Sequence, residues 1–469
     1  MSTSHAITDQ AVAFVEGLAY ERLPEEAVHL GLRCILDSVG LYIAGTTEHS
    51  VRILIDEARD QGGRADATLL GATDTRVPAA MAARVLGTAG HAHDWDDTQV
   101  SHDPAHVYGL LTHPSVPPLT ATLVMAQRLG GVDGRRFMTA FLAGFEVECK
   151  ISEWMKPDHY RRGHHTSGNV GTFGAAVAAA SLIGLTGERL RHALGMAASF
   201  SAGIRCNFGT MTKPLHVGRA AENGVIAALL AERGFTADPT PLDGRWGYLQ
   251  VMGNGFSEEK VAEGFANPLT IVSPGVSIKP YPSGILTHQS MDAMLKLVTD
   301  HDVKPDEVER ITFYAGSNIL EPIRYDIAEN HLQAKFSMAA LLAMMVLYRG
   351  AGRREFTDEC VGSAAMQDMQ RRITTQLDPE IEARGFDRIR SRIELVTRDG
   401  RTLTQWADER YRGGPSLPMT DDEVADKFRA CTDGLLSAAR QQAVIDGVMG
   451  LVALDDTAVI GDWLRVQPA

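Results

Sequence analysis

Residues 171–185 read GTFGAAVAAASLIGL, and residues 219–235 read RAAENGVIAALLAERGF. Alanine and glycine dominate both runs, with larger apolar residues between them. Alanine has the highest helix propensity of the amino acids, and small side chains let helix backbones approach their neighbours closely. The two runs therefore predict closely packed helices, and the sequence on either side extends this pattern.

Most of the chain before residue 270 places apolar residues at helical spacing. The segment PEEAVHLGLRCILDSVGLYIAG (24–45) begins with proline and two acids and ends in glycine, which are standard helix start and stop signals. The segment at 6–23, which Thr8 could cap, and the segment at 134–155 are predicted helices of the same kind.

The sequence changes character near residue 270, where LTIVSPGVSIKPYPSG (269–284) is rich in proline and glycine. A strand is predicted at 308–314, a helix at 331–350, and a hairpin around Asp399-Gly400, before helices return after about residue 415. The predicted fold is mainly α. A large all-helical domain (1–272) is joined again by C-terminal helices (413–469), and a smaller α+β lid domain (273–412) is inserted between them. A cleft between two domains is a common place for a small-molecule site.

Bulk composition limits the possible partners. The chain has 469 residues, 44% of them hydrophobic, and a formal net charge of −14, which argues against non-specific nucleic-acid binding. Five scattered cysteines without a CxxC pair argue against a disulfide framework or a structural zinc site. The N-terminus lacks the layout of a signal peptide, and the most apolar run, FSMAALLAMMVLY, is too short to span a bilayer. We expect a cytoplasmic protein with no membrane or nucleic-acid partner.

The segment GHAHDWDDTQVSHDPAHVYGLLTHPS (90–115) concentrates titratable groups. It holds five histidines and four aspartates, which are His91, His93, His102, His106, His113, Asp94, Asp96, Asp97 and Asp103. Three interpretations are open: a metal site, a polar loop that satisfies its own backbone, and an acid–base site. The histidine spacing and Pro104 disfavour metal ligation. The three carboxyls at 94, 96 and 97 are close in sequence and repel one another. This repulsion favours an acid–base site in which one of them is protonated or acts as a base.

Three later segments add basic groups next to predicted helix starts. They are YRRGHHTSGNVGTFGAAVAAA (160–180), GTMTKPLHVGRAAENG (209–224) and KPYPSGILTHQSMDAM (279–294). Each alone is compatible with an ordinary capped helix and solvated lysines. Together they offer histidines and carboxylates for proton transfer, with lysines and helix N-termini for anionic groups. No GxGxxG followed by a strand, P-loop, haem or iron–sulfur pattern is present. The residues predict cofactor-free proton chemistry on a small anion.

These segments, in this order and over nearly the whole chain, resemble the MmgE/PrpD family. The residues that carry the resemblance are HAHDWDDT with THPS, HHTSGNVGTFGAA, GTMTKPLHVGRAAENG, KPYPSGILTHQSMDA and LQAKFSM. The family includes 2-methylcitrate dehydratase, cis-aconitate decarboxylase and iminodisuccinate epimerase. The resemblance implies a helical domain with an α+β lid, a homodimer, a small carboxylate substrate, and no metal or organic cofactor.

The resemblance also implies which residues face the substrate. They are Asp94, Thr98, His113, His165, Lys213 and Lys279. One position departs from the pattern. Decarboxylase-like members have a histidine after the YP pair and dehydratase-like members often a cysteine, whereas this chain has Gly284. The stretch SHDPAHVYGLL (101–111) is an addition relative to the decarboxylase pattern and is expected to reshape the pocket.

The expected reaction is proton abstraction from a carbon next to a carboxylate. Asp94 or His165 would act as base, and His113 or Thr98 would protonate a departing hydroxyl. Tyr160 or His165 would serve as the second group of an epimerase. Developing negative charge would be stabilised by substrate-binding groups, which are Lys213, Lys279, Ser167, Gly168 and Ser283.

The first expectation is therefore a dehydratase-like lyase acting on a small di- or tricarboxylate. An epimerase of a dicarboxylate such as iminodisuccinate and a cis-aconitate-type decarboxylase remain alternatives within the family. A carboxylate-binding protein without activity and a metalloenzyme are the alternatives from other classes.

Overall fold

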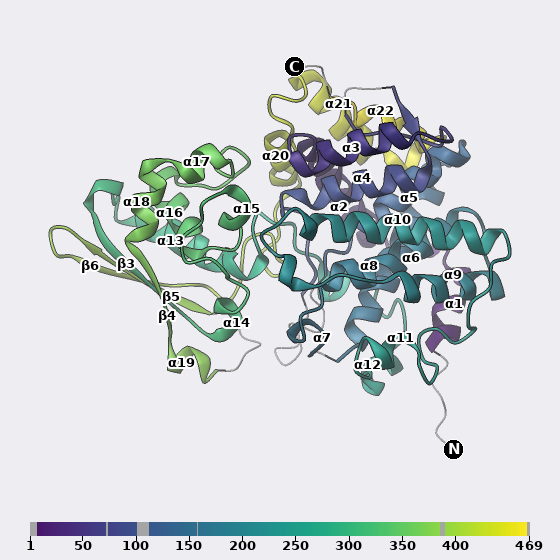
Figure 1. Ribbon diagram of the computed structural model, residues 1–469, viewed down its shortest axis with the longest axis horizontal. Coiled ribbons are helices and arrows are strands. Elements are labelled where there is room, and N and C mark those ends of the chain that lie inside the picture. Colours follow the sequence, from purple (N-terminus) through teal and green to yellow (C-terminus); the bar gives the residue numbers. More distant parts are fainter. Residues whose placement is uncertain (1–6, 72–73, 101–111, 157, 385–389, 467–469) are drawn as a thin grey trace.

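The computed structural model describes residues 7–71, 74–100, 112–156, 158–384 and 390–466. Figure 1 shows a larger, mainly helical lobe and a smaller lobe that combines helices with the strands β3–β6. The predicted fold class, mainly α with a smaller α+β part, is confirmed. The added stretch 101–111 lies outside the described residues.

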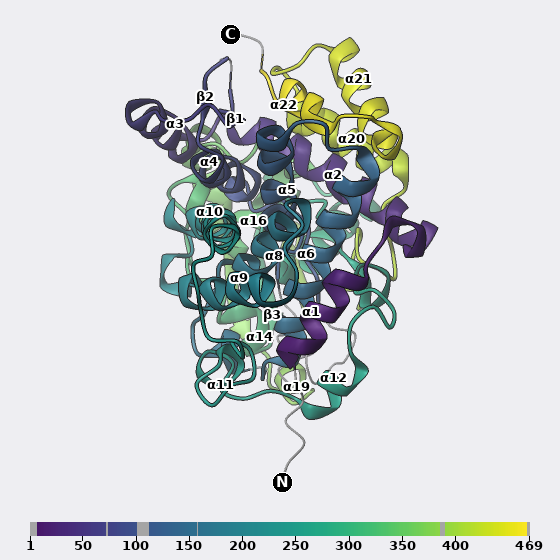
Figure 2. The ribbon, with the colours of Figure 1, turned by 90° about the vertical axis from the view of Figure 1, so that its right-hand side faces the viewer.

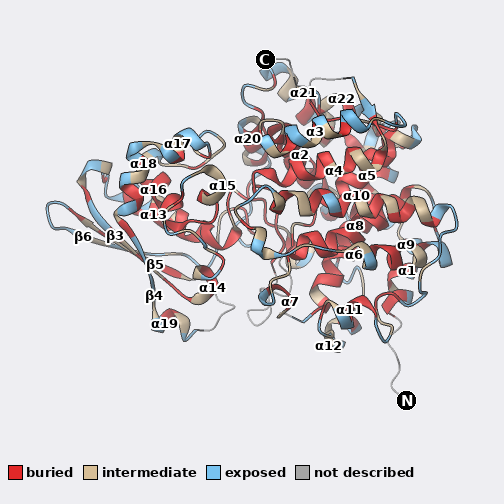
Figure 3. Cartoon of the chain, in the orientation of Figure 1, coloured by how far each residue is buried: buried red, intermediate tan, exposed pale blue. Residues whose placement is uncertain are grey.

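Long helices pack around α8 in the larger lobe (Figure 2). The main helices are α2 (Glu25–Gly45), α4 (Ala79–Ala92), α5 (Val116–Leu129), α6 (Gly134–Trp154), α8 (Thr166–Leu182), α9 (Gly187–Phe200) and α10 (Thr212–Glu232). The alanine- and glycine-rich runs lie on α8 and α10, which contact each other. A Cβ atom at Gly224 of α10 would come within 2.5 Å of the Ala175 Cβ of α8, so only glycine permits this approach. Almost every residue of α8 is buried (Figure 3).

Shorter elements complete the larger lobe. They are α1 (Ile7–Gly17), α3 (His49–Gln61), α7 (Asp158–Arg161), α11 (Tyr248–Val251), α12 (Glu258–Glu263), and the two-residue strands β1 (Ala67–Thr68) and β2 (Arg76–Val77). The suggestion that Thr8 caps the first helix is wrong, because Thr8 lies inside α1. Its hydroxyl donates instead to Asp243 Oδ1 at 2.6 Å, which ties α1 to a distant loop.

The C-terminal helices return to the larger lobe. They are α20 (Asp421–Thr432), α21 (Ala438–Met449) and α22 (Ile460–Trp463). Helix α20 packs on α2, and Phe428 belongs to the same hydrophobic core as the N-terminal helices. Among the described residues, α2 is the one helix long and apolar enough to cross a membrane, but 78% of its most apolar window is buried inside the protein. Its apolar surface is therefore accounted for by core packing.

The smaller lobe has a core of its own around a four-stranded sheet in the order β4-β3-β5-β6. Its strands are β3 (Val308–Ala315), β4 (Ile373–Leu377), β5 (Ser391–Thr397) and β6 (Thr402–Trp406). Strand β3 pairs in parallel with β4 and antiparallel with β5, and β5 pairs antiparallel with β6. The predicted strand at 308–314 corresponds to β3, and the predicted hairpin around Asp399-Gly400 corresponds to β5 and β6.

Helices cover this sheet and fill the rest of the smaller lobe. They are α13 (His288–Asp300), α14 (Ser317–Leu320), α15 (His331–Ala334), α16 (Met338–Tyr348), α17 (Asp358–Gly362), α18 (Ala364–Arg371) and α19 (Pro379–Glu382). The prediction of a single helix at 331–350 is wrong, because this segment forms two helices. It is divided into α15 and α16 because the Ser337 hydroxyl accepts from the Ala340 amide and starts a new helix.

Candidate active site

A cavity is lined by residues from both lobes. Its lining residues are Asp94, Thr98, His113, Tyr160, His165, Ser167, Phe208, Lys213, Lys279, Gly284, Ile285, Leu286, Thr287, Pro322, Ile323 and Phe336. Eight of the ten residues named as site candidates from the sequence line this cavity, so the structure brings together segments up to 185 residues apart. The other two, Gly168 and Ser283, do not line it.

Asp94 lies in the turn that follows α4 and is the common partner of two lysines. Its Oδ1 lies 2.8 Å from Lys279 Nζ, and its Oδ2 lies 3.0 Å from Lys213 Nζ. All three side chains are at most 6% exposed. Burial alone would raise the pKa of Asp94, but the charges of Lys213 and Lys279 hold it well below its usual range. Asp94 is therefore ionised at neutral pH and is a weak proton acceptor.

His91, at the end of α4, orients Lys213. The Lys213 ammonium donates to His91 Nε2 at 3.0 Å, and His91 Nδ1 lies 2.9 Å from the Asp96 carboxylate. This arrangement places the His91 proton on Nδ1. Burial, with Lys213 alongside, lowers the pKa of His91 to about 3, so the ring is neutral. From the sequence, His91 was predicted only as a member of the histidine–aspartate cluster, although its place at the head of HAHDWDDT was the available signal.

His113 precedes α5 and presents one nitrogen toward Asp94. Its Nδ1 lies 2.9 Å from the Asp97 carbonyl oxygen and 3.2 Å from Asp96 Oδ2, whereas Nε2 lies 4.0 Å from Asp94 Oδ1. The His113 amide donates to the Ser167 hydroxyl at 2.9 Å, which fixes this segment against the start of α8. His113 Nε2 is thus the nitrogen available for proton transfer toward the cavity.

His165 directly precedes α8 and is a neutral imidazole. Burial lowers its pKa well below the usual value, and Lys213 lowers it further. Its Nδ1 lies 3.0 Å from Nδ1 of His216, and its ring packs edge-on against Phe208. His165 therefore lines the cavity as a neutral imidazole and is a candidate base, and its lowered pKa makes it a weak proton acceptor, as Asp94 is.

Tyr160 and Thr98 complete the polar wall. The guanidinium of Arg205 stacks 4.0 Å from the centre of the Tyr160 ring, and burial raises the pKa of that phenol. The Thr98 hydroxyl lies 3.4 Å from His113 Nδ1, and its amide donates to the Ser277 carbonyl at 2.9 Å. The Arg205 side chain thus positions the Tyr160 ring, and a backbone contact positions Thr98.

Gly168 and Ser283 lie behind the cavity wall. The Gly168 amide donates to the His165 carbonyl at 3.0 Å within the first turn of α8, so it is not directed at a ligand. The buried Ser283 hydroxyl lies 3.0 Å from the Thr287 hydroxyl. The adjoining Gly284 does line the cavity, and a Cβ atom there would meet nothing within 4 Å.

The apolar part of the cavity lining was not predicted from the sequence. It consists of Phe208, Ile285, Leu286, Pro322, Ile323 and Phe336. Lys213 Nζ lies 5.2 Å from the centre of the Phe208 ring and 5.5 Å from that of Phe336, within the range of cation–π attraction. Phe336 belongs to the motif LQAKFSM, which was the available signal for that residue.

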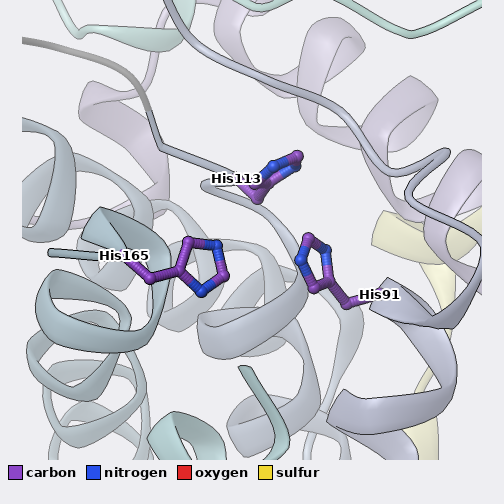
Figure 4. A group of neighbouring side chains, drawn as sticks. All are labelled: His91, His113 and His165. Atoms are coloured by element: carbon purple, nitrogen blue, oxygen red, sulfur yellow. The ribbon is translucent and has the colours of Figure 1, made fainter. Parts of the chain in front are cut away.

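Two groups of described side chains have the donor types of a metal site. The ring nitrogens of His91, His113 and His165 lie within 4.8 Å of one another, and Figure 4 shows the three rings around a common space. His91, Asp94, Asp96 and His113 form a second group. Both nitrogens of His91 are already engaged, by Asp96 and by the Lys213 ammonium. A divalent cation would have to displace Lys213 or share the site with its charge, which disfavours metal binding.

Among the three crowded carboxyls, the raised pKa falls on Asp97. Burial raises it to about 7, and the nearby Asp37 and Asp96 add to the shift, while a hydrogen bond from Ser115 opposes it. Asp97 does not line the cavity. Its role in the described structure is to accept the amide and hydroxyl of Ser115 at the start of α5.

The chain matches two domain families in succession. Residues 9–260 match the MmgE/PrpD N-terminal domain, and residues 281–451 match the MmgE/PrpD C-terminal domain. The chain belongs to the MmgE/PrpD family. The relatives of this family member include cis-aconitate decarboxylase of Homo sapiens, 28% identical over 98% of this chain and 95% of the relative. Cis-aconitate decarboxylase of Mus musculus is 27% identical, and the match covers 98% of this chain and 93% of the relative. Cis-aconitate decarboxylase of Aspergillus terreus is 23% identical, and the match covers 98% of this chain and 96% of the relative.

These relatives and the family together support a lyase of the dehydratase or decarboxylase type. This MmgE/PrpD protein also brings titratable and other polar side chains together in the lining of one cavity.

Proposed function

We propose that the protein is a cofactor-independent lyase that acts on a small di- or tricarboxylate by proton transfer next to a carboxylate. One observation carries the proposal: two buried ammonium groups, Lys213 and Lys279, share the single carboxylate of Asp94 beside a neutral His165. Lys213 and Lys279 both line the cavity and share Asp94 as a counter-ion, so they offer two cationic groups to an anionic substrate. The neutral imidazole supplies a proton acceptor.

In the proposed dehydration, His165 takes a proton from the carbon next to a substrate carboxylate. The electron pair of that bond moves toward the carboxylate, and Lys213 and Lys279 stabilise the charge on its oxygens. The pair then forms the carbon–carbon double bond while the neighbouring carbon–oxygen bond breaks. His113 Nε2 donates a proton to the departing hydroxide, so the products are an unsaturated carboxylate and water.

A decarboxylase of the cis-aconitate type is the second candidate, because the relatives named above carry that name and align over nearly the whole chain. In this reaction a carbon–carbon bond breaks and releases CO₂, and His113 Nε2 protonates the carbon that retains the electron pair. The histidine expected after the YP pair in such members is replaced by Gly284, so any proton must come from another side chain.

Proton NMR in D₂O tests the proposal directly. The purified protein is mixed with 2-methylcitrate, citrate, cis-aconitate and iminodisuccinate, each in a separate sample. New vinyl signals with retention of all carboxyl carbons support dehydration, and loss of CO₂ supports decarboxylation. Deuterium entry at the carbon next to a carboxylate without elimination would favour an epimerase. No change in any sample of folded protein would contradict the proposal and favour a binding role or another anion.

A further inference from the structure

The turn at residues 92–95 holds Asp94 in an unusual backbone conformation. Helix α4 ends at Ala92, and Asp94 has a φ of +54°, in the left-handed region that residues other than glycine rarely adopt. This conformation costs free energy that the surrounding contacts must offset. It also places the Asp94 carboxylate between Lys213 and Lys279. What holds the turn therefore also holds the charges of the site.

Three buried lysines donate to the backbone of this turn. Lys335 Nζ lies 2.8 Å from the Ala92 carbonyl oxygen, Lys279 Nζ lies 2.9 Å from that of Asp94, and Lys427 Nζ lies 2.7 Å from that of Trp95. Their exposures are 2%, 1% and 5%. Hydrogen bonds from charged donors are among the strongest in proteins, and burial removes competing water. Three of the four carbonyls in the turn are thus bound by ammonium groups.

The two lysines that do not line the cavity come from distant parts of the chain. Lys335 directly follows α15 in the smaller lobe, and Lys427 lies in α20 near the C-terminus. The smaller lobe also reaches the turn a second way. His331 of α15 bonds Glu48 Oε2 at 3.1 Å, and Glu48 Oε1 lies 3.4 Å from His93 Nδ1. The position of the smaller lobe is therefore linked directly to the Asp94 turn.

We propose that Lys335 and Lys427 are positioning residues, which hold the 92–95 turn so that the Asp94 carboxylate stays between Lys213 and Lys279. Through them, the smaller lobe and the C-terminal helices each control the geometry of the site. The structural part of this inference stands on the contacts above, and only its kinetic part rests on the proposed function.

A purely structural role would have a different consequence. Lys427 also pairs with the buried Asp37 at 2.6 Å, and the charge of Lys335 interacts with Glu48. If the two lysines only neutralised those carboxylates, replacing them would lower stability and leave the 92–95 turn unchanged. The conformation of residue 94 and the separation of kcat from KM distinguish the two roles.

The test is the Lys335→Met variant, which keeps an unbranched side chain that is one heavy atom shorter and removes the charge. We expect its crystal structure to show residue 94 displaced from the left-handed region, or the Asp94 carboxylate moved by about 1 Å. A displacement of this size lowers kcat by about 10- to 100-fold. KM should change less than kcat, because the substrate contacts of Lys213 and Lys279 remain. Lys296→Met, at an exposed lysine of α13 in the same lobe, is the matched control and should leave both unchanged.

A second variant addresses the possibility that Lys335→Met does not fold. Asp37→Asn with Lys427→Met removes a buried ion pair as a unit and leaves no buried charge without a partner. The inference is overturned if folded variants keep residue 94 and its carboxylate in place, even where the melting temperature falls. If the wild-type protein acts on none of the four carboxylates, the proposed function fails, and the crystal structures alone decide this inference.

Discussion

The ammonium of Lys279 contacts Asp94 at two atoms, 2.8 Å from Oδ1 and 2.9 Å from the backbone carbonyl oxygen. Lys213 holds the second carboxylate oxygen at 3.0 Å. Asp94 is therefore the internal counter-ion of both lysines. A substrate carboxylate that binds these lysines must share them with Asp94, so this residue affects turnover and anion affinity in opposite directions.

Asp94→Asn should separate those two effects. We expect kcat/KM to fall by at least about 10²-fold, because the charge that orients both lysines is lost. The affinity for a carboxylate such as citrate should rise, because the lysines lose their competing anion. Steady-state kinetics and isothermal titration calorimetry measure the two quantities. Near-normal turnover with unchanged affinity would contradict the role of Asp94, and Asp300→Asn at an exposed position is the control.

Lys213→Ala should reduce kcat/KM by at least about 10²-fold while the protein stays folded. It removes one of the two cations that face the substrate and the donor to His91 Nε2. Asp94 keeps Lys279 as a partner, so no buried charge is left alone. Kinetics with circular dichroism on the same samples check this expectation. A folded variant with wild-type turnover would contradict the assignment of Lys213 to the active site.

Local signals in the sequence explain which elements were predictable. The segment of α2 begins with proline and two acids and ends in glycine, and β5 and β6 have a turn with aspartate and glycine between them. Strand β4 was not predicted, because Ile373 is the one buried residue among its five and no alternation marks it. The division of the helix at 331–350 was missed because the capping Ser337 lies within an otherwise apolar run.

The site was predictable as a set of residues but not as a set of contacts. Histidines, lysines and aspartates next to helix starts carry a chemical signal, and these residues converge on the cavity. Their pairings depend on tertiary structure, as with Lys213 and His91, which are 122 residues apart. The apolar part of the cavity lining carries no signal of this kind, because Ile323 and Leu286 look like any core residue.

The pH dependence of kcat/KM should extend unusually far to the acid side. A histidine base works when deprotonated, and burial together with Lys213 holds the pKa of His165 well below 6.5. Activity should therefore persist as the pH falls through 6.5 and be lost only nearer the lowered pKa. On the basic side, burial lowers the pKa of Lys213 from 10.5, so activity should decline before pH 10.5. A half-loss at pH 6.5 would contradict His165 as the base.

Gly284→Ala should fold at least as well as the wild type. The residue has a φ of −58°, and an added Cβ would meet nothing within 4 Å, so neither backbone nor space requires glycine. Such a replacement typically raises stability by about 0.4–1 kcal/mol, because it restricts the unfolded chain. Thermal unfolding measures the change. A large loss of stability would show that glycine is required here.

Gly284→His extends this prediction to the reaction. The new imidazole would stand in the cavity wall and add a proton donor that this chain lacks at the position. If protonation at carbon limits decarboxylation, the Gly284→His variant should release CO₂ from cis-aconitate faster than the Gly284→Ala variant does. The alanine variant is the control, because it also adds a side chain but no proton donor. An equal rate in the two variants would show that the position does not supply the proton.

His331→Asn should weaken the contact between the lobes in a pH-dependent way. Burial lowers the pKa of His331, but Glu48 and Asp358 raise it more, and the net shift is upward. A raised pKa in the folded state gives stability that is fully present below about pH 6.5 and lost as the pH rises through the folded value. The variant should therefore be less stable than the wild type by about 1 kcal/mol near pH 6 and should approach it near pH 9. Denaturant unfolding at both pH values checks this, with the exposed His301→Asn as control, and a constant difference across the range would contradict it.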